Sequence, residues 1–198
     1  MQGIVDGEKT GGSCCVVLRV ASVHPQSTTA GLSPNEDKRT EVFLAGCRMA
    51  LSGHPCPGCF NVDLWDEKYF PEVSVNDLFC DIKEAGNKFV TIVGGEPLDQ
   101  FDELVRLMAL LQKHGYHVVL ITHYTMEVIR LRFSDVLKRA NVIIDGCYEA
   151  RKRIFDEVDI PGVTHVIGSE NQGFWHRENN DWTRLNIYQD DLRKAYCA

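Results

Sequence analysis

The amino-acid sequence predicts an α/β fold built on a mostly parallel sheet. Apolar runs of strand length alternate with helical patterns, turn residues separate them, and the intervals between strands leave room for crossover helices. Such sheets have right-handed crossovers and bind ligands at the carboxyl ends of their strands. We expect a single domain over residues 1–198, with a core at about 14–172 and a polar tail at 173–198.

The first part of the series contains two expected strands, Cys14–Val20 and Glu41–Ala45. Between them, Ser22–Arg39 is rich in Ser, Thr, Pro and charged residues, which predicts a long loop. The segment Cys47–Asn61 is rich in Gly and Pro, so we expect no regular structure there. Ser74, followed three residues later by an aspartate, predicts the start of a helix that runs to about residue 86.

The second part continues the alternation of strands and helices. The clearest helix begins near residue 101, where apolar side chains recur at the spacing of one buried face, and it ends near Gly115. A further helix is expected over Met126–Leu137. The expected strands are Phe89–Val93, His117–Ile121, Val142–Ile144 and Thr164–Ile167. The tail carries isolated aromatic residues, and we expect it to pack back on the domain.

Composition excludes several classes of protein. The net charge of −7 and the lack of a long basic run argue against nucleic acid or anionic lipid as a partner. The sequence shows neither a signal peptide nor an apolar stretch of about 20 residues, so we expect a cytoplasmic protein with no membrane segment.

Disulfides are rare in the reducing cytosol. A cluster of cysteines in a cytosolic protein therefore indicates metal binding or catalysis. Five cysteines are scattered and are expected to be small buried apolar residues: Cys14, Cys15, Cys80, Cys147 and Cys197.

The remaining three cysteines are closely spaced. Cys47, Cys56 and Cys59 follow a predicted strand with the pattern C-x8-C-x2-C. Thiolates on one loop suit an iron-sulfur cluster or a structural zinc ion. His54 could complete a tetrahedral Cys3His zinc site, so the spacing alone leaves both alternatives open.

A second motif, T-I-V-G-G-E-P at residues 91–97, ends another predicted strand. Two glycines at this point let a ligand approach the backbone, and Pro97 suits the first position of the next helix. A glycine-rich turn is weak evidence by itself. Together, the two motifs lie at the ends of two strands of one series, where a shared site would form, and this favours the iron-sulfur interpretation.

The sequence resembles the radical SAM superfamily and, within it, the activating proteins of anaerobic ribonucleoside-triphosphate reductase. The resemblance covers roughly residues 40–172 and rests on five stretches in order. These are F-L-A-G-C at 43–47, C-P-G-C-F-N at 56–61, G-G-E-P-L at 94–98, I-I-D-G at 143–146 and G-S-E-N-Q at 168–172.

The resemblance implies a partial (β/α) barrel and two cofactors. A [4Fe-4S] cluster would be bound by Cys47, Cys56 and Cys59, leaving one iron open for S-adenosylmethionine. The motif residues Gly94, Gly95 and Glu96 would hold the methionine part of that cofactor. The expected neighbours of the cofactors are Gly58, Phe60 and Asn61.

The implied reaction is reductive cleavage of S-adenosylmethionine to a 5′-deoxyadenosyl radical, which abstracts hydrogen from a glycine of the large subunit of the anaerobic reductase. A one-electron donor such as flavodoxin or ferredoxin would supply the electron. Two alternatives remain: a radical SAM enzyme acting on another protein or a small molecule, and a Cys3His zinc-stabilised binding module.

The chain departs from the family pattern at several points. The first two cysteines are separated by eight residues where the family usually has three, and T-H-Y-T at 122–125 replaces T-G-Y-T. We expect His123 to be a polar surface residue. Asp145 would either help to bind a monovalent cation or be a buried aspartate bonded to backbone amides, and the latter is favoured. Asn171 and Gln172 match family positions and are expected to form hydrogen bonds.

Overall fold

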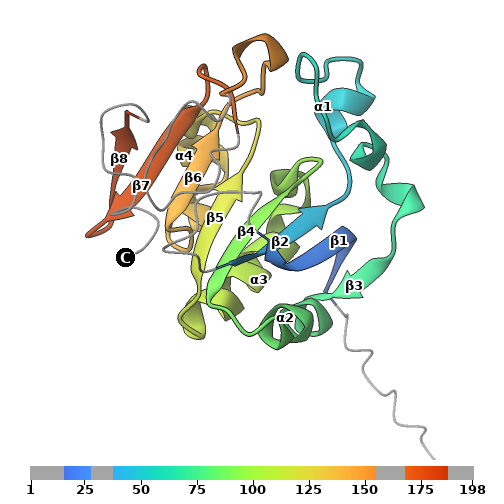
Figure 1. Cartoon of the computed structure of the whole chain (residues 1–198), viewed down its shortest axis with the longest axis vertical. Coiled ribbons are helices and arrows are strands. Elements are labelled where there is room, and N and C mark those ends of the chain that lie inside the picture. Colours follow the sequence, from blue (N-terminus) through green and yellow to red (C-terminus); the bar gives the residue numbers. More distant parts are fainter. Residues whose placement is uncertain (1–15, 28–37, 155–167, 187–198) are drawn as a thin grey trace, which may run out of the picture.

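The computed structural model describes residues 16–27, 38–154 and 168–186, which form one eight-stranded sheet with helices packed against it (Figure 1). The strand order is β3-β1-β2-β4-β5-β6-β7-β8. The predicted strand Thr164–Ile167 and three of the scattered cysteines, Cys14, Cys15 and Cys197, lie outside the described residues.

The elements have the following bounds. The strands are β1 (Val17–Ser27), β2 (Arg39–Leu44), β3 (Glu72–Ser74), β4 (Phe89–Gly94), β5 (His117–Ile121), β6 (Val142–Asp145), β7 (Gly173–Glu178) and β8 (Asp181–Leu185). The α-helices are α1 (Arg48–Leu51), α2 (Val75–Glu84), α3 (Phe101–Lys113), α4 (Met126–Arg132) and α5 (Ser134–Leu137). A 3-10 turn, η3 (Pro97–Gln100), precedes α3.

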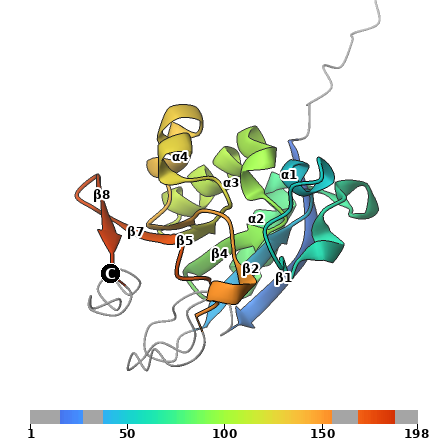
Figure 2. The same ribbon diagram turned by 90° about the horizontal axis from the view of Figure 1, so that it is seen from above.

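The centre of the sheet is parallel, and its two sides are antiparallel. Strands β2, β4, β5 and β6 pair in parallel, whereas β1 and β3 on one side and β7 and β8 on the other are antiparallel. The strand order advances in one direction through the parallel core, so right-handed crossovers place their helices on one face. Helices α2, α3 and α4 indeed lie on one side of the sheet (Figure 2). The predicted α/β class is confirmed, and the open sheet has the form of a partial barrel.

The N-terminal half differs from the sequence prediction in two places. Strand β1 continues to Ser27 because it pairs with β2 from Val20 onwards, with Ser27 opposite Arg39. The first part of the predicted loop Ser22–Arg39 is therefore strand, and that prediction was wrong. The cysteine segment also contains regular structure, the one-turn helix α1. Its first N–H, from Arg48, donates to the Asp99 carboxylate at 2.7 Å, a cap from a residue that is distant in sequence.

The helices agree more closely with the predictions. The hydroxyl of Ser74 accepts a hydrogen bond from the N–H of Asp77 at 3.1 Å, which caps α2 as expected. Helix α3 buries one apolar face, formed by Leu104, Leu107, Met108 and Leu111. The expected helix Met126–Leu137 is divided at Phe133, whose φ of −130° and ψ of 31° are not helical and whose ring packs on Phe101 and Tyr124.

The predicted polar tail begins with a hairpin that extends the sheet. Strand β7 pairs with β6, where Gly173 lies opposite Asp145, and β8 pairs with β7. The two strands join through Asn179 and Asn180, whose φ values of 49° and 72° suit the tight hairpin turns that asparagine favours. The sequence analysis expected this tail to pack on the domain but did not identify the two strands.

The main core lies between the sheet and the helices. It contains the apolar side chains of β2, β4, β5 and β6 that point towards α2, α3 and α4, and these are almost fully buried. Across residues 16–27, 38–154 and 168–186, no helix has the length and apolar character needed to cross a membrane. The fold thus leaves the carboxyl ends of four parallel strands free to form a site.

Candidate functional site

A pocket with a cavity volume of about 100 Å³ lies at the carboxyl ends of the parallel strands and opens to solvent. Its walls come from the segments that follow β2, β4, β5 and β6. Parallel sheets bind ligands at this edge. Seven of the predicted site residues line the pocket: Cys47, Cys56, Cys59, Phe60, Asn61, Gly94 and Gly95. The other two, Gly58 and Glu96, are not among the lining residues.

The first cysteine is held in place by its own backbone. The N–H of Gly46 donates to the carbonyl of Leu64 at 2.7 Å, and the N–H of Cys47 donates to the carbonyl of Trp65 at 2.9 Å. These bonds fix the end of β2 against the segment that follows the cysteine motif. Cys47 is buried, whereas Cys56 and Cys59 are half-buried.

The second and third cysteines form a tight turn. The N–H of Cys59 donates to the carbonyl of Cys56 at 3.0 Å, and Gly58 between them has φ of +75°. A Cβ at Gly58 would lie 2.5 Å from the Cβ of Ala150. The turn therefore requires glycine on two grounds, left-handed backbone and close contact with the chain after β6. Gly58 shapes the cysteine turn.

The glycine pair at the end of β4 lies against the backbone at the end of β2. A Cβ at Gly94 would lie 2.1 Å from the carbonyl oxygen of Leu44, and one at Gly95 would lie 2.1 Å from that of Gly46. Backbone hydrogen bonds join the same segments, from Gly95 to Leu44 at 2.8 Å and from Glu96 to Gly46 at 2.6 Å. Close approach of two strand ends thus already requires both glycines, a reason that the sequence analysis did not find.

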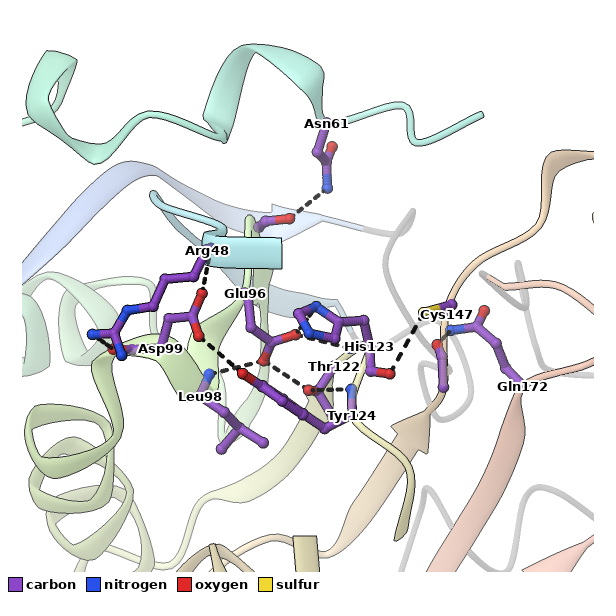
Figure 3. Close-up of polar contacts among 12 residues, drawn as sticks. Arg48, Asn61, Glu96, Leu98, Asp99, Thr122, His123, Tyr124, Cys147 and Gln172 are labelled. Carbon is purple, nitrogen blue, oxygen red and sulfur yellow. Dashed lines mark hydrogen bonds and ion pairs between the residues drawn. The ribbon is translucent and has the colours of Figure 1, made fainter. Parts of the chain in front are cut away.

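Glu96 is fully buried, and protein donors surround its carboxylate. Oε1 accepts hydrogen bonds from the N–H of Leu98 at 2.9 Å and the hydroxyl of Thr122 at 2.7 Å. Oε2 accepts from the N–H of His123 at 2.8 Å and lies 2.8 Å from Nδ1 of the same histidine (Figure 3). The side chain of Glu96 therefore joins the turn after β4 to the turn after β5.

His123 is not the polar surface residue that we expected, and that prediction was wrong. Its side chain is only 9% exposed and lines the pocket. Burial alone would lower the pKa of His123, but its hydrogen bonds with Cys47 and Glu96 and their charges raise it to about 10. A buried carboxylate thus holds a cationic ring beside the first cysteine of the motif.

Three amides tie the sequence motifs to one another. Asn61 donates to the carbonyl of Gly94 at 2.9 Å, which joins the cysteine loop to the glycine pair. Asn171 donates to the carbonyl of Cys147, and Gln172 donates to that of Gly146, both at 2.7 Å. The expected hydrogen bonds of Asn171 and Gln172 are present, and they hold the turn that follows β6.

Cys147 lies next to the site, between the pocket-lining residues Gly146 and Tyr148, and the sequence analysis did not place it there. It was expected to be a small buried residue, yet it is half-buried and its thiol interacts with that of Cys56. Its sulfur also lies 3.9 Å from the carbonyl oxygen of His123. The only available signal was its position, two residues after the end of a strand that points to the pocket. Cys80, also expected to be buried, is exposed.

Asp145 has the role that the sequence analysis favoured. Its carboxylate accepts hydrogen bonds from the N–H of Met126 at 2.5 Å and from the indole of Trp175 at 2.9 Å. Burial raises the pKa of Asp145, and the bonds from Trp175, Met126 and Gly173 oppose that rise. The residue joins the start of α4 to the hairpin.

The chemistry of the cysteines fits a metal-sulfur group. Burial and the neighbouring thiol of Cys147 raise the pKa of Cys56 to about 12, so this thiol keeps its proton until a cation displaces it. In the described part of the chain, no three His, Cys, Asp or Glu side chains converge on one point as they would around a single ion. A cubane differs from an ion in this respect, because each cysteine binds a separate iron.

The zinc alternative has less support. A tetrahedral site needs four ligands around one ion. His54 is exposed, is absent from the pocket lining and has its Nδ1 3.5 Å from the hydroxyl of Ser52. The geometry does not bring His54 to the three cysteines.

Comparison with known proteins identifies the family. The model of the family described as "4Fe-4S single cluster domain" matches residues 36–172. The chain belongs to this family. The match includes the cysteine loop, the glycine motif and the final G-S-E-N-Q segment. The family is of the radical SAM type, and the cofactors of the chain are accordingly a [4Fe-4S] cluster and S-adenosylmethionine.

Curated relatives include the pyruvate formate-lyase-activating enzymes of Listeria monocytogenes serovar 1/2a and Listeria innocua serovar 6a. Each is 33% identical to this chain over 111 residues, which cover 53% of this chain and 41% of the relative. The chain thus spans less than half the length of these relatives. Among solved structures, QueE from Escherichia coli matches with a TM-score of 0.40 and 23% identity over 58% of this chain and 64% of that one.

Proposed function

We propose that this 4Fe-4S single cluster domain is a cytoplasmic activase that generates a glycyl radical on an anaerobic ribonucleoside-triphosphate reductase. The observation that carries the proposal is the meeting of two motifs in one pocket. The three cysteines after β2 and the glycine pair at the end of β4 line the same cavity, although more than 30 residues separate them in sequence.

The cysteines Cys47, Cys56 and Cys59 would hold the cluster, because they are the three family-pattern thiols that line the pocket. When bound, the reduced cluster supplies the electron that cleaves S-adenosylmethionine. The glycine pair brings the backbone after β4 to the pocket wall, where its polar groups can meet the methionine part of the cofactor. Glu96 would act through the backbone and through His123, since its carboxylate already has protein donors.

The residues around the pocket would also protect the reaction from water. Phe43, Val93 and Ile121 give the pocket an apolar wall formed by three adjacent strands. A radical formed inside would meet few competing hydrogen donors, and the protein's contribution is orientation and exclusion of solvent.

The choice of a protein substrate rests on three observations. The curated relatives are activating enzymes by name, and the five sequence motifs resemble the activating proteins of the anaerobic reductase. The pocket mouth also offers apolar contacts, because Phe60 lines the pocket yet is 58% exposed. Its ring packs edge-on against Tyr148, with centroids 5.0 Å apart. Such a rim suits an inserted polypeptide loop. In this proposal, flavodoxin or ferredoxin is the electron donor.

In the test, the protein is mixed under anaerobic conditions with its cognate reductase, S-adenosylmethionine and a chemical reductant. Electron paramagnetic resonance should detect a doublet that collapses when the partner's glycine carries deuterium, and deuterium should appear in 5′-deoxyadenosine. Cys59→Ser should abolish both signals, whereas Cys80→Ser, which alters an exposed thiol outside the pocket lining, should retain them. Cleavage of S-adenosylmethionine without either signal would refute the proposed substrate.

A further inference from the structure

The peptide bond between Gly94 and Gly95 is held at both of its polar ends. Its N–H, from Gly95, donates to the carbonyl of Leu44 at 2.8 Å. Its carbonyl, from Gly94, accepts a hydrogen bond from the side-chain amide of Asn61 at 2.9 Å (Figure 3). A carbonyl oxygen only accepts, so the Asn61 atom that faces it is the amide nitrogen. One peptide of the pocket wall is thus bonded to the end of β2 and to the cysteine loop.

This peptide needs to be held because a glycine stands on each side of it. Neither residue has a Cβ, so the two torsions that flank the peptide bond are weakly restricted, and the peptide could rotate with little movement of its neighbours. Gly94 has φ of +133°, a conformation that other residues rarely adopt. Rotation would reverse the directions of the carbonyl and the N–H. The two hydrogen bonds therefore decide how the polar groups of this part of the pocket wall are oriented.

Asn61 is itself fixed to the cysteine loop. It follows Cys59 by two residues, and its own carbonyl accepts the N–H of Leu64 at 3.0 Å across the 3-10 turn η1 (Val62–Leu64). The carbonyl of Leu64 accepts the N–H of Gly46, next to the first cysteine, at 2.7 Å. The side chain of Asn61 is half-buried and lines the pocket. The orientation of the glycine peptide is therefore linked to the segment that carries the cysteines.

We propose that Asn61 is a positioning residue that fixes the Gly94–Gly95 peptide in the orientation that binds S-adenosylmethionine. The inference rests on the proposed function, in which the glycine pair meets the methionine part of that cofactor. Because Asn61 holds the peptide in advance, the cofactor does not have to select one orientation among several. Without the amide, other orientations become populated, and the apparent affinity falls with the fraction of protein that remains competent to bind.

The variant Asn61→Leu removes the amide and keeps an uncharged side chain of similar size. We expect it to assemble the cluster, to bind S-adenosylmethionine about tenfold more weakly, and to exchange the amide hydrogen of Gly95 faster than wild type. Asn87→Leu is the matched control, because its half-buried amide donates to the hydroxyl of Thr40 at 3.1 Å and links the start of β4 to β2. Asn87 is outside the pocket lining, so its replacement should change neither quantity.

The measurements are equilibrium binding of S-adenosylmethionine and hydrogen–deuterium exchange resolved to single amides, both on anaerobically reconstituted protein of known iron content. Failure of wild-type protein to bind iron or S-adenosylmethionine would refute the proposed function. Equal affinities in wild type and Asn61→Leu, with full iron in both, would refute only this inference. Weaker binding with unchanged exchange at Gly95 would also overturn it, because Asn61 would then contact the cofactor directly and would not position the peptide.

A further outcome needs no variant to fold. In iron-loaded wild-type protein without S-adenosylmethionine, the amide hydrogen of Gly95 should already exchange slowly, because both hydrogen bonds of the peptide are present before the cofactor binds. Exchange at the rate of an unstructured peptide, with protection that develops only after S-adenosylmethionine is added, would overturn the proposal.

Discussion

His123 should make the stability of the cluster-free protein depend on pH. Its pKa rises from an ordinary 6.5 to about 10 in the folded state. A raised pKa means that the folded state binds the proton more tightly, so the stabilisation is complete below about pH 6.5 and is lost as the pH rises towards about 10. Chemical denaturation across this range should show the free energy of unfolding falling more in wild type than in His123→Asn. Parallel pH profiles for the two proteins would contradict the assignment.

Gly95 provides a prediction that differs from the one its motif alone would give. If Gly95 only faced a ligand, as the motif suggests, Gly95→Val would lose S-adenosylmethionine binding but keep the cluster. In the structure, a Cβ at Gly95 would lie 2.1 Å from the carbonyl oxygen of Gly46, one residue before Cys47. We therefore expect Gly95→Val to lose iron as well as S-adenosylmethionine binding, measured as iron per chain after reconstitution.

Gly53 is the control for this experiment. It lies in the cysteine loop with φ of +88°, but a Cβ there would meet no atom within 4 Å. Gly53→Ala should cost only about 1–2 kcal/mol of backbone strain and keep the cluster.

Retention of full iron by Gly95→Val would contradict the prediction for Gly95, because it would show that the strand ends separate without disturbing Cys47.

Among the elements, α1 depends on a cap supplied by a distant segment. Asp99 accepts a hydrogen bond from the N–H of Arg48 at 2.7 Å and from the hydroxyl of Tyr124 at 3.2 Å. Asp99→Ala should lower the free energy of unfolding by about 1–2 kcal/mol and expose the cysteine loop to limited proteolysis. Asp81→Ala, on the exposed face of α2, should do neither. Equal effects of the two substitutions would argue against the cap.

In addition to the backbone pairing of β7 with β6, a buried acid, Asp145, links the β7–β8 hairpin to the start of α4. Trp175 donates to Oδ1 of Asp145 at 2.9 Å, and removal of this donor leaves part of a buried carboxylate unsatisfied. Trp175→Phe should therefore reduce the free energy of unfolding by about 1–3 kcal/mol, measured in urea. Trp182→Phe on β8 should have a smaller effect. The reverse order would show that packing, and not this hydrogen bond, anchors the hairpin.

For the whole molecule, local patterns were sufficient to predict the parallel core. The mostly apolar sequence of β4 and the apolar periodicity of α3 identify elements that are buried on predictable faces. The hairpin was missed because its residues alternate only weakly in polarity, and its Asn179–Asn180 turn is a short signal. The one-turn helix α1 was missed because its cap, Asp99, is 51 residues away.

The site was predictable where its residues follow strand ends in sequence. Cys47 lies three residues after the end of β2 and Gly95 directly follows β4, and topology brings the ends of neighbouring parallel strands together. Contacts between side chains were not predictable, because a sequence carries no distances between segments. The pairing of His123 with Glu96 and the approach of Cys147 to Cys56 are of this kind.

The central claim is that the three cysteines of the loop after β2 bind a [4Fe-4S] cluster with one iron open to S-adenosylmethionine. The most direct test is iron analysis and electron paramagnetic resonance of anaerobically reconstituted protein, in wild type and in Ser variants of Cys47, Cys56, Cys59 and Cys80. Wild type and Cys80→Ser should hold about four irons per chain, with a spectrum that S-adenosylmethionine alters, and the other three variants should lose this cluster. Stoichiometric zinc without iron, or full cluster content in any of those three variants, would contradict the claim.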